Sequence, residues 1–206
     1  MNVLVMAGGE GTRLGRGEKP LLEVAGFPMI KWLLRALEGA HLGPLYVAVT
    51  DRTPGTAALM EKEGVHLIHT SGKGYIEDMR EAIVKSSLSG PVLVISADLP
   101  LLTHDILRDI VSAYKKNKNP ALAVYTTREF CNSHGIEKKE EISPAGINIV
   151  SGSRILEDPE AIQSEYRLIM DRIEVALNVN TEQDLRLCEI FSRKVYKHGW
   201  IDHPGV

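Results

Sequence analysis

The sequence predicts an α/β fold, Rossmann-like, with a mostly parallel mixed sheet and helices on both of its faces. Short, nearly continuous apolar runs alternate along the chain with amphipathic stretches of helical length. This alternation is typical of buried parallel strands joined by crossover helices. The connections between these runs are short, and no Ser/Gly/Pro-rich linker divides the 206 residues. We therefore expect a single domain over residues 1–206.

The expected elements follow in order along the chain. Strands are expected at residues 3–6, 45–49, 65–68, 92–95, 122–125, 147–150 and 175–177. Helices are expected at residues 28–38, 56–63, 76–87, 104–117 and 181–193. Residues 128–141 are polar and charge-dense without clear periodicity, so we expect an inserted loop there, a candidate for a mobile lid. Residues 198–206 are expected to form a loose tail.

Composition and charge exclude several classes of protein. The formal net charge of −3 lacks the basic excess of nucleic-acid-binding proteins, so we expect no nucleic-acid partner. The apolar runs are strand-sized, and the N-terminus has neither a basic region nor a long apolar segment, which argues against a membrane span and a secretory signal. Cys131 and Cys188 lie far apart, as expected for thiols in a reducing cytoplasm. The oligomeric state stays open, with a homodimer as one alternative.

A glycine-rich loop follows the first expected strand directly. It reads Ala-Gly-Gly-Glu-Gly-Thr-Arg-Leu-Gly over residues 7–15, and Glu-Lys-Pro follows at 18–20. In open α/β sheets, ligands bind at the carboxyl ends of the strands, and glycines let backbone N–H groups point at phosphate oxygens. Arg13 and Lys19 add two cations suited to phosphates. We expect a nucleoside triphosphate to bind here, on Ala7, Gly8, Gly9, Glu10, Gly11, Thr12, Arg13 and Lys19.

Two other glycine motifs fit this loop less well. A P-loop ends in Gly-Lys-Ser/Thr, but Gly15 is followed by Arg16. A dinucleotide-binding fingerprint needs its third glycine one place earlier than Gly15, and a continuous helix that Pro20 would break. An ordinary surface turn is the remaining alternative, and the cations beside the glycines disfavour it.

Asp98 stands directly after the apolar run 92–95, in the sequence Ser-Ala-Asp-Leu-Pro. A carboxylate at the end of a buried strand is costly unless it is paired or binds a metal. Mg²⁺ is commonly held by one or two carboxylates together with substrate phosphates. Asp98 could instead cap the next helix, but Thr103 is better placed for that cap. Asn180 and Thr181 open the last expected helix, where either residue alone is most simply an N-cap.

The loop as a whole resembles the signature of nucleotidyltransferases that include molybdopterin and sugar-1-phosphate guanylyl- and uridylyltransferases. The match covers residues 7–20. This resemblance implies a Rossmann-like, GT-A-like fold, dependence on Mg²⁺ and release of pyrophosphate. It also implies catalytic roles for Arg13, Lys19 and Asp98, with Asp98 and Asn180 as metal ligands.

Residues 70–78, 143–150 and 178–185 narrow the resemblance to the archaeal GTP:adenosylcobinamide-phosphate guanylyltransferases. The likeness runs from Asn2 to about Cys188 and is weakest at residues 128–141. It implies GTP as donor, adenosylcobinamide phosphate as acceptor, and adenosylcobinamide-GDP and pyrophosphate as products. Nucleotide contacts are then expected at Ser71, Gly72, Lys73 and Gly74, and acceptor contacts at Pro144, Ala145, Gly146 and Asn148.

Three alternatives stay open at this stage. The acceptor could be another phosphorylated compound, such as molybdopterin or a sugar phosphate. A nucleotide-binding regulator without catalysis would lack Arg13, Lys19 or Asp98, and all three are present. A dinucleotide-dependent oxidoreductase has only Asp51, at the end of the second expected strand, in its favour.

Overall fold

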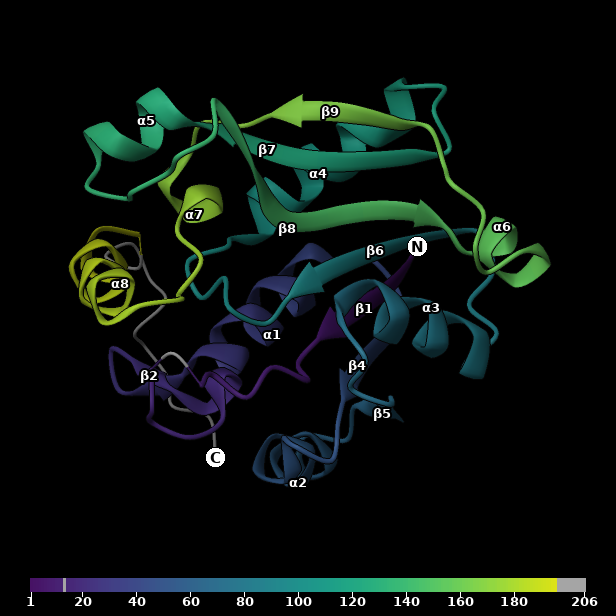
Figure 1. Ribbon diagram of the computed structural model, residues 1–206, viewed down its shortest axis with the longest axis horizontal. Helices are drawn as coiled ribbons and strands as arrows, with labels where there is room; N and C mark the ends of the chain where they lie inside the picture. The colour runs from purple at the N-terminus through teal and green to yellow at the C-terminus, as the bar shows by residue number, and fades with distance from the viewer. Residues whose placement is uncertain (13, 196–206) are drawn as a thin grey trace.

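The computed structural model describes residues 1–12 and 14–195 and shows a seven-stranded mixed sheet covered by helices (Figure 1). The strand order is β5-β4-β1-β6-β8-β7-β9, and β8 alone runs antiparallel to its neighbours. The strands are β1 Asn2–Met6, β4 Leu45–Val49, β5 His66–His69, β6 Pro91–Ser96, β7 Ala121–Thr127, β8 Ile142–Ser151 and β9 Glu165–Ile169. The predicted fold class is confirmed. The tail predicted at residues 198–206 lies outside the described residues.

Helices cover both faces of the sheet because each buried strand presents apolar side chains alternately to either side. Val3 and Val5 pack in one cluster with residues of α1, α2 and α4, whereas Leu4 and Met6 pack in another with residues of α3 and α6. These helices are α1 Met29–Ala40, α2 Pro54–Lys62, α3 Tyr75–Lys85, α4 His104–Lys116 and α6 Gly152–Glu157. The sheet is thus the middle layer of three.

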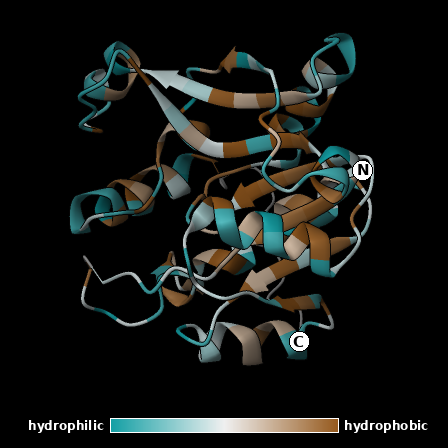
Figure 2. Cartoon of the chain, turned by 45° about the vertical axis from the view of Figure 1, so that its right-hand side comes forward, coloured by the Kyte–Doolittle hydropathy of each residue, from teal (hydrophilic) through white to brown (hydrophobic). Residues whose placement is uncertain are grey.

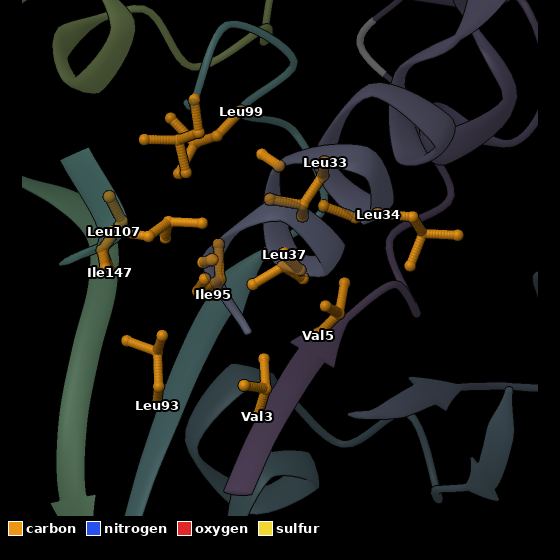
Figure 3. Packing of buried hydrophobic residues seen from close by; sticks show 14 of the residues in the cluster. Val3, Val5, Leu33, Leu34, Leu37, Leu93, Ile95, Leu99, Leu107 and Ile147 are labelled. Atoms are coloured by element: carbon orange, nitrogen blue, oxygen red, sulfur yellow. The ribbon is translucent and has the colours of Figure 1, made fainter. Parts of the chain in front are cut away.

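The α1 side holds the larger core. Figure 3 shows leucines of α1 pointing toward valine, leucine and isoleucine side chains of β1 and β6. Leu33, with none of its surface exposed, is at the centre of this packing, and burying such a side chain contributes about 2 kcal/mol. Figure 2 shows the same division by hydropathy, with hydrophobic strands inside and hydrophilic residues on the outer faces of the helices.

A smaller subassembly lies beside the carboxyl end of the sheet. It comprises the hairpin β2 Glu23–Val24 and β3 Phe27–Pro28, the short helices η1 Lys19–Leu21, α5 Arg128–Ser133 and α7 Ile173–Ala176, and α8 Glu182–Val195. In Figure 1, α8 lies next to β2. A separate apolar cluster that includes Val24, Trp32, Leu185 and Cys188 joins these pieces to the amino-terminal part of α1.

The structure corrects two of the predicted elements and contains others that the sequence did not predict. The prediction of a strand at 175–177 is wrong, since Ile173–Ala176 form the helix α7. The prediction failed because the pattern of a short buried apolar run does not distinguish a strand from a helical turn. Strand β9 was not expected, since it lies at the exposed edge of the sheet without a long apolar run. The loop expected at 128–141 begins with helix α5, whose N-cap Thr127 accepts a hydrogen bond from the N–H of Phe130.

The chain connections create a ligand-binding position at this carboxyl edge. From β1 the chain passes through α1 to β4 and then through α2 to β5, and α3 returns it to β6 on the other side of β1. The carboxyl ends of β1 and β6 therefore flank a topological switch point, where open α/β sheets bind ligands. Within the described part of the chain, no helix has the length and apolar character needed to span a membrane.

Candidate active site

A cleft of about 360 Å³ opens at this switch point. Its walls come from the loops after β1, β4, β5 and β6, four segments that the sequence separates by up to 90 residues. The lining residues are Met6, Gly8, Gly9, Glu10, Thr12, Lys19, Pro20, Arg52, Gly72, Gly74, Tyr75, Asp78, Ser96, Ala97 and Asp98. Most of the predicted nucleotide-binding residues and Asp98 are therefore brought to one cavity.

The glycine-rich loop forms one wall, and two of its glycines are required by close approaches. A Cβ atom on Gly8 would lie 2.6 Å from Cγ2 of Thr50, whose hydroxyl donates a hydrogen bond to the Gly8 carbonyl. Gly11 has a φ of +68°, and a Cβ atom there would lie 2.9 Å from Cβ of Lys19. Among the described residues, none accepts a hydrogen bond from the N–H groups of residues 8–12. These N–H groups are the donors that a phosphate would use.

Charged residues flank the loop at the β4 side of the cleft. Glu10 lines the cleft and forms an ion pair with Arg52, with 3.2 Å between Oε1 and Nε. Ala7 is buried, and its N–H donates to the Ala48 carbonyl, so Ala7 anchors the loop instead of facing the cleft. Arg13, expected to be catalytic, lies outside the described residues.

Lys19 connects the loop to the opposite wall. Its ammonium donates to Oδ2 of Asp98 at 2.5 Å and to Oδ1 of Asn180 at 2.9 Å. Only 16% of the Lys19 side chain and 12% of the Asp98 side chain are exposed, so water screens this ion pair little. The three residues are separated by 79 and 82 positions in sequence, yet their polar atoms converge on one point.

Neighbouring amides hold Asp98 and Asn180 in place. The side-chain amide of Asn178 donates both to Oδ1 of Asp98 and to the Ala145 carbonyl, at 3.3 and 3.0 Å. Helix α8 is capped by Thr181, whose hydroxyl accepts a hydrogen bond from the N–H of Asp184. In return, the carboxylate of Asp184 accepts a hydrogen bond from the N–H of Thr181. Asn180 is therefore not required as the cap, and its side-chain oxygen faces Lys19.

The alternative role of Asp98 as a helix cap does not apply. Thr103 is the N-cap of α4, and its hydroxyl accepts from the N–H of Ile106, as the sequence predicted. Asp98 precedes the helix by more than a turn, and its carboxylate is directed to Lys19 and Asn178.

The oxygens around the Lys19 ammonium fit a divalent metal. One carboxylate oxygen and one amide oxygen approach the same cation, and both are ligand types that Mg²⁺ accepts. No group of three His, Cys, Asp or Glu side chains suited to a metal occurs within residues 1–12 and 14–195. A metal here would therefore take its remaining ligands from substrate phosphates and water, as Mg²⁺ commonly does.

The segment Ser71–Gly74 contributes less than the sequence indicated. The N–H groups of Gly72 and Lys73 donate to the buried Asp78 carboxylate, and Ser71 donates from its N–H and hydroxyl to Glu81. A hydrogen bond from Lys85, followed by those from Ser71, lowers the pKa of Glu81 to about 2. Only Gly72 and Gly74 of this segment line the cleft.

Two of the residues expected to contact the acceptor, Ala145 and Gly146, lie close to Asn178, whose amide is bonded to Asp98. A bulge shifts the β7–β8 register, and Gly146, with a φ of +75°, lies within it. A Cβ atom on Gly146 would lie 3.2 Å from Cβ of Ser96, so β8 passes close to the end of β6. Ala145 is buried and contributes its carbonyl to Asn178, whereas exposed Pro144 pairs with Tyr125 of β7.

Tyr75 is a cleft residue that the sequence did not single out. It opens α3, next to the expected nucleotide segment, and its hydroxyl is hydrogen-bonded to Asn148 of β8. Burial of the hydroxyl, opposed in part by that hydrogen bond, raises the pKa of Tyr75 to about 12. The residue as a whole is 38% exposed, so the burial concerns the hydroxyl and not the entire ring. Tyr75 therefore spans the cleft from its nucleotide side to β8.

Sequence comparison places the chain among nucleotidyltransferases. Residues 3–171 match the family described as MobA-like NTP transferase domain. An adenosylcobinamide-phosphate guanylyltransferase from Methanocaldococcus jannaschii is 36% identical over 204 residues, which cover 94% of this chain and 98% of that protein. A 3-deoxy-manno-octulosonate cytidylyltransferase from Bradyrhizobium diazoefficiens is 28% identical over 80% of this chain, which spans 63% of that protein.

Solved structures share the fold at much lower identity. A CMP:2-keto-3-deoxy-manno-octonic acid synthetase complexed with CTP superposes with a TM-score of 0.71 at 14% identity, over 94% of this chain and 98% of its own. A putative glucose-1-phosphate thymidylyltransferase from Bacillus anthracis superposes with a TM-score of 0.70 at 15% identity, over 94% of this chain and 95% of its own. At these identities the likeness describes the fold alone.

Proposed function

Since the chain belongs to the MobA-like NTP transferase family, we propose that it is a guanylyltransferase of cobalamin biosynthesis. It transfers GMP from GTP to adenosylcobinamide phosphate, giving adenosylcobinamide-GDP and pyrophosphate. The observation that carries this proposal is the 36% identity with the Methanocaldococcus enzyme, which extends over nearly the full length of both chains. The cleft supports it, because a triphosphate needs N–H donors, a cation and a metal-binding carboxylate together.

The residues around the cleft indicate how the donor GTP would be oriented in it. Loop residues 8–12 would bind the phosphates, and Asp98 and Lys19 would lie near the α-phosphate. The acceptor would enter from β8, where Asn148 and Gly146 lie. The guanine would then extend the other way, toward Arg52 and Gly72 at the ends of β4 and β5.

The reaction needs no general base. The acceptor is a phosphate monoester, whose second pKa of about 6 makes it a dianion at neutral pH. One of its oxygens bonds to the α-phosphorus of GTP while the bond from that phosphorus to the bridging oxygen of the β-phosphate breaks, and pyrophosphate leaves. The difficulty is the approach of two anions, so catalysis consists of positioning and neutralisation of charge.

Individual residues take roles in that neutralisation. The loop N–H groups donate to phosphate oxygens of the donor. The Lys19 ammonium, now on Asp98 and Asn180, would turn to the donor phosphates, and Arg13 would add a second cation. Asp98 and Asn180 would then hold Mg²⁺, which when bound supplies positive charge to the donor phosphates. Tyr75 and Asn148 would donate hydrogen bonds to the acceptor.

The two substrates are the partners in this proposal. The net charge of −3 does not favour a nucleic acid as a further partner. We place the protein in the cytoplasm, where free thiols such as those of buried Cys131 and Cys188 stay reduced.

A pyrophosphate-release panel tests the proposal. The protein is assayed with GTP, ATP, CTP and UTP, each with cobinamide phosphate, glucose 1-phosphate or molybdopterin as acceptor. We expect turnover with GTP and cobinamide phosphate at least about tenfold above every other pair. Preference for glucose 1-phosphate or molybdopterin would contradict the acceptor, and preference for another triphosphate would contradict the donor.

A further inference from the structure

The residue before Lys19 makes an unusual set of contacts. Glu18 crosses from the end of the glycine-rich loop to the start of α2, 37 and 38 positions away. One carboxylate oxygen accepts from the N–H of Gly55 at 2.7 Å, and the other accepts from the N–H and the hydroxyl of Thr56, each at 2.6 Å. An anion at a helix N-terminus satisfies unpaired N–H groups and is favoured by the helix dipole.

The glycine at position 55 makes this approach fit. A Cβ atom there would lie 2.9 Å from Oε1 of Glu18 and 3.0 Å from Cδ1 of Leu21. Gly55 lies in the first turn of α2 and its φ is not in the left-handed region, so these close approaches, and not its backbone conformation, favour a glycine at this position. The first turn of α2 is thus shaped to receive the Glu18 carboxylate.

Lys19 is held from the other side. Its ammonium bonds to Asp98 and Asn180, while its backbone packs against Gly11 of the loop. Glu18 and Lys19 therefore fix the end of the loop between α2 on one side and β6 and α8 on the other. A lysine side chain has a flexible four-carbon stem, so its own contacts position the ammonium poorly once it leaves Asp98 for a phosphate.

We propose that Glu18 is a positioning residue, which sets Lys19 for the donor phosphates by anchoring the chain to the N-terminus of α2. The inference rests on the proposed function only in giving Lys19 a role at the triphosphate. Misplacement of a catalytic group by 1 Å can cost about a hundredfold in rate. Glu18 is not among the residues that line the cleft, so it would act through Lys19.

A double-mutant cycle tests this coupling. Glu18→Ala should lower kcat roughly ten- to hundredfold, because the lysine is still present but no longer fixed. Lys19→Ala should lower kcat at least about a hundredfold. In the Lys19→Ala background, Glu18→Ala should change kcat less than about twofold. Losses that multiply in the double variant would overturn the proposal, since Glu18 would then act independently of Lys19.

A second variant separates positioning from helix capping. Gly55→Ala leaves both charged side chains in place but directs a methyl group at the Glu18 carboxylate. Since alanine also favours helix, we expect kcat to fall by about tenfold while the melting temperature holds or rises. Normal kcat in Gly55→Ala, or a Glu18→Ala variant that loses thermal stability but keeps kcat, would show that Glu18 serves only as a cap.

Glu63→Ala is the matched control. Glu63 caps the other end of α2, and its carboxylate pairs with Lys31 at 2.8 Å, away from the cleft. This variant should keep kcat within about twofold of wild type. The proposed function is tested separately, on the wild-type protein. Turnover with a different acceptor would refute that function, but the double-mutant cycle could still be measured with the acceptor that is turned over. If the protein turns over none of these acceptors, the affinity of each variant for GTP is measured by calorimetry instead of kcat. We then expect Glu18→Ala to weaken GTP binding in the wild-type background and to have little effect in the Lys19→Ala background.

Discussion

The ammonium of Lys19 lies 2.5 Å from Oδ2 of Asp98, at the position where a metal ion held by Asp98 would lie. Asn180 completes this arrangement with its side-chain oxygen at 2.9 Å. The protein thus carries its own cation at the position proposed for Mg²⁺, and the two cations cannot share it. Under the proposed mechanism the lysine would leave these oxygens when the metal binds, and the triphosphate would provide the anion to which it turns.

Lys19→Ala should separate metal binding from turnover. Without the ammonium, Asp98 and Asn180 are open to a divalent ion, so the affinity of the nucleotide-free protein for Mn²⁺ should rise severalfold. Turnover should fall by at least about a hundredfold, the effect of losing one group that stabilises charge in the transition state. Mn²⁺ titration followed by electron paramagnetic resonance, beside a pyrophosphate-release assay, measures both. Weaker Mn²⁺ binding in the variant would contradict competition for the same oxygens.

Tyr75→Phe should affect the acceptor and not the donor. The change removes one hydroxyl, so the KM for the acceptor should rise about three- to tenfold, the effect of one hydrogen bond of about 1 kcal/mol. The affinity for GTP, measured by calorimetry, should stay within about twofold. Because the pKa of Tyr75 is raised to about 12, the hydroxyl stays protonated up to pH 10, and the effect on KM should be constant from pH 7 to 10.

Tyr46→Phe is the control for this prediction. Tyr46 lies on β4, where its ring stacks on His66 with 5.3 Å between centroids, outside the cleft. Its substitution should leave both kinetic constants unchanged. A Tyr75→Phe variant that loses GTP affinity while keeping its acceptor KM would place the hydroxyl on the donor.

Gly8→Ala should disturb the loop, and a change at Thr50 should relieve it. The added Cβ atom would lie 2.6 Å from Cγ2 of Thr50. Forcing this methyl group into place should cost about 1–3 kcal/mol of unfolding free energy and weaken GTP binding. Thr50→Ser removes Cγ2 but keeps the hydroxyl that bonds to the Gly8 carbonyl. The double variant should regain most of the stability and GTP affinity; a double variant as impaired as Gly8→Ala alone would place the conflict elsewhere.

Much of this site was predictable from the sequence because its parts are local. The glycine-rich loop, Asp98 and Thr103 each stand at the end or the start of an element whose apolar pattern is clear, so their positions at the sheet edge could be inferred. The contacts between them could not. That Glu18 reaches α2, and Tyr75 reaches Asn148, depends on the packing of segments that are 37 to 73 positions apart.

Errors in the predicted fold have the same origin. Residues 175–177 are fully buried, so their apolar run carries no periodicity that distinguishes a strand from the helical turn α7. Strand β9 is mostly exposed, and its pairing with β7 depends on backbone hydrogen bonds that composition does not reveal. The conformation of both elements depends on tertiary contacts with the rest of the protein, which their local sequence does not reveal.

Asp98→Asn tests the central claim, that this carboxylate supports nucleotidyl transfer to adenosylcobinamide phosphate. An asparagine keeps the size of the side chain but removes the negative charge that pairs with Lys19 and would hold the metal. Because that charge is compensated by Lys19, its loss should lower the unfolding free energy by about 1–3 kcal/mol without unfolding the protein.

The decisive measurement is formation of adenosylcobinamide-GDP, followed by mass spectrometry in a Mg²⁺ titration, with wild type and Asp98→Asn side by side. We predict product from the wild type and a rate at least about a hundredfold lower in the variant, restored only in part by excess Mg²⁺. Equal rates with the same dependence on Mg²⁺ would contradict the account.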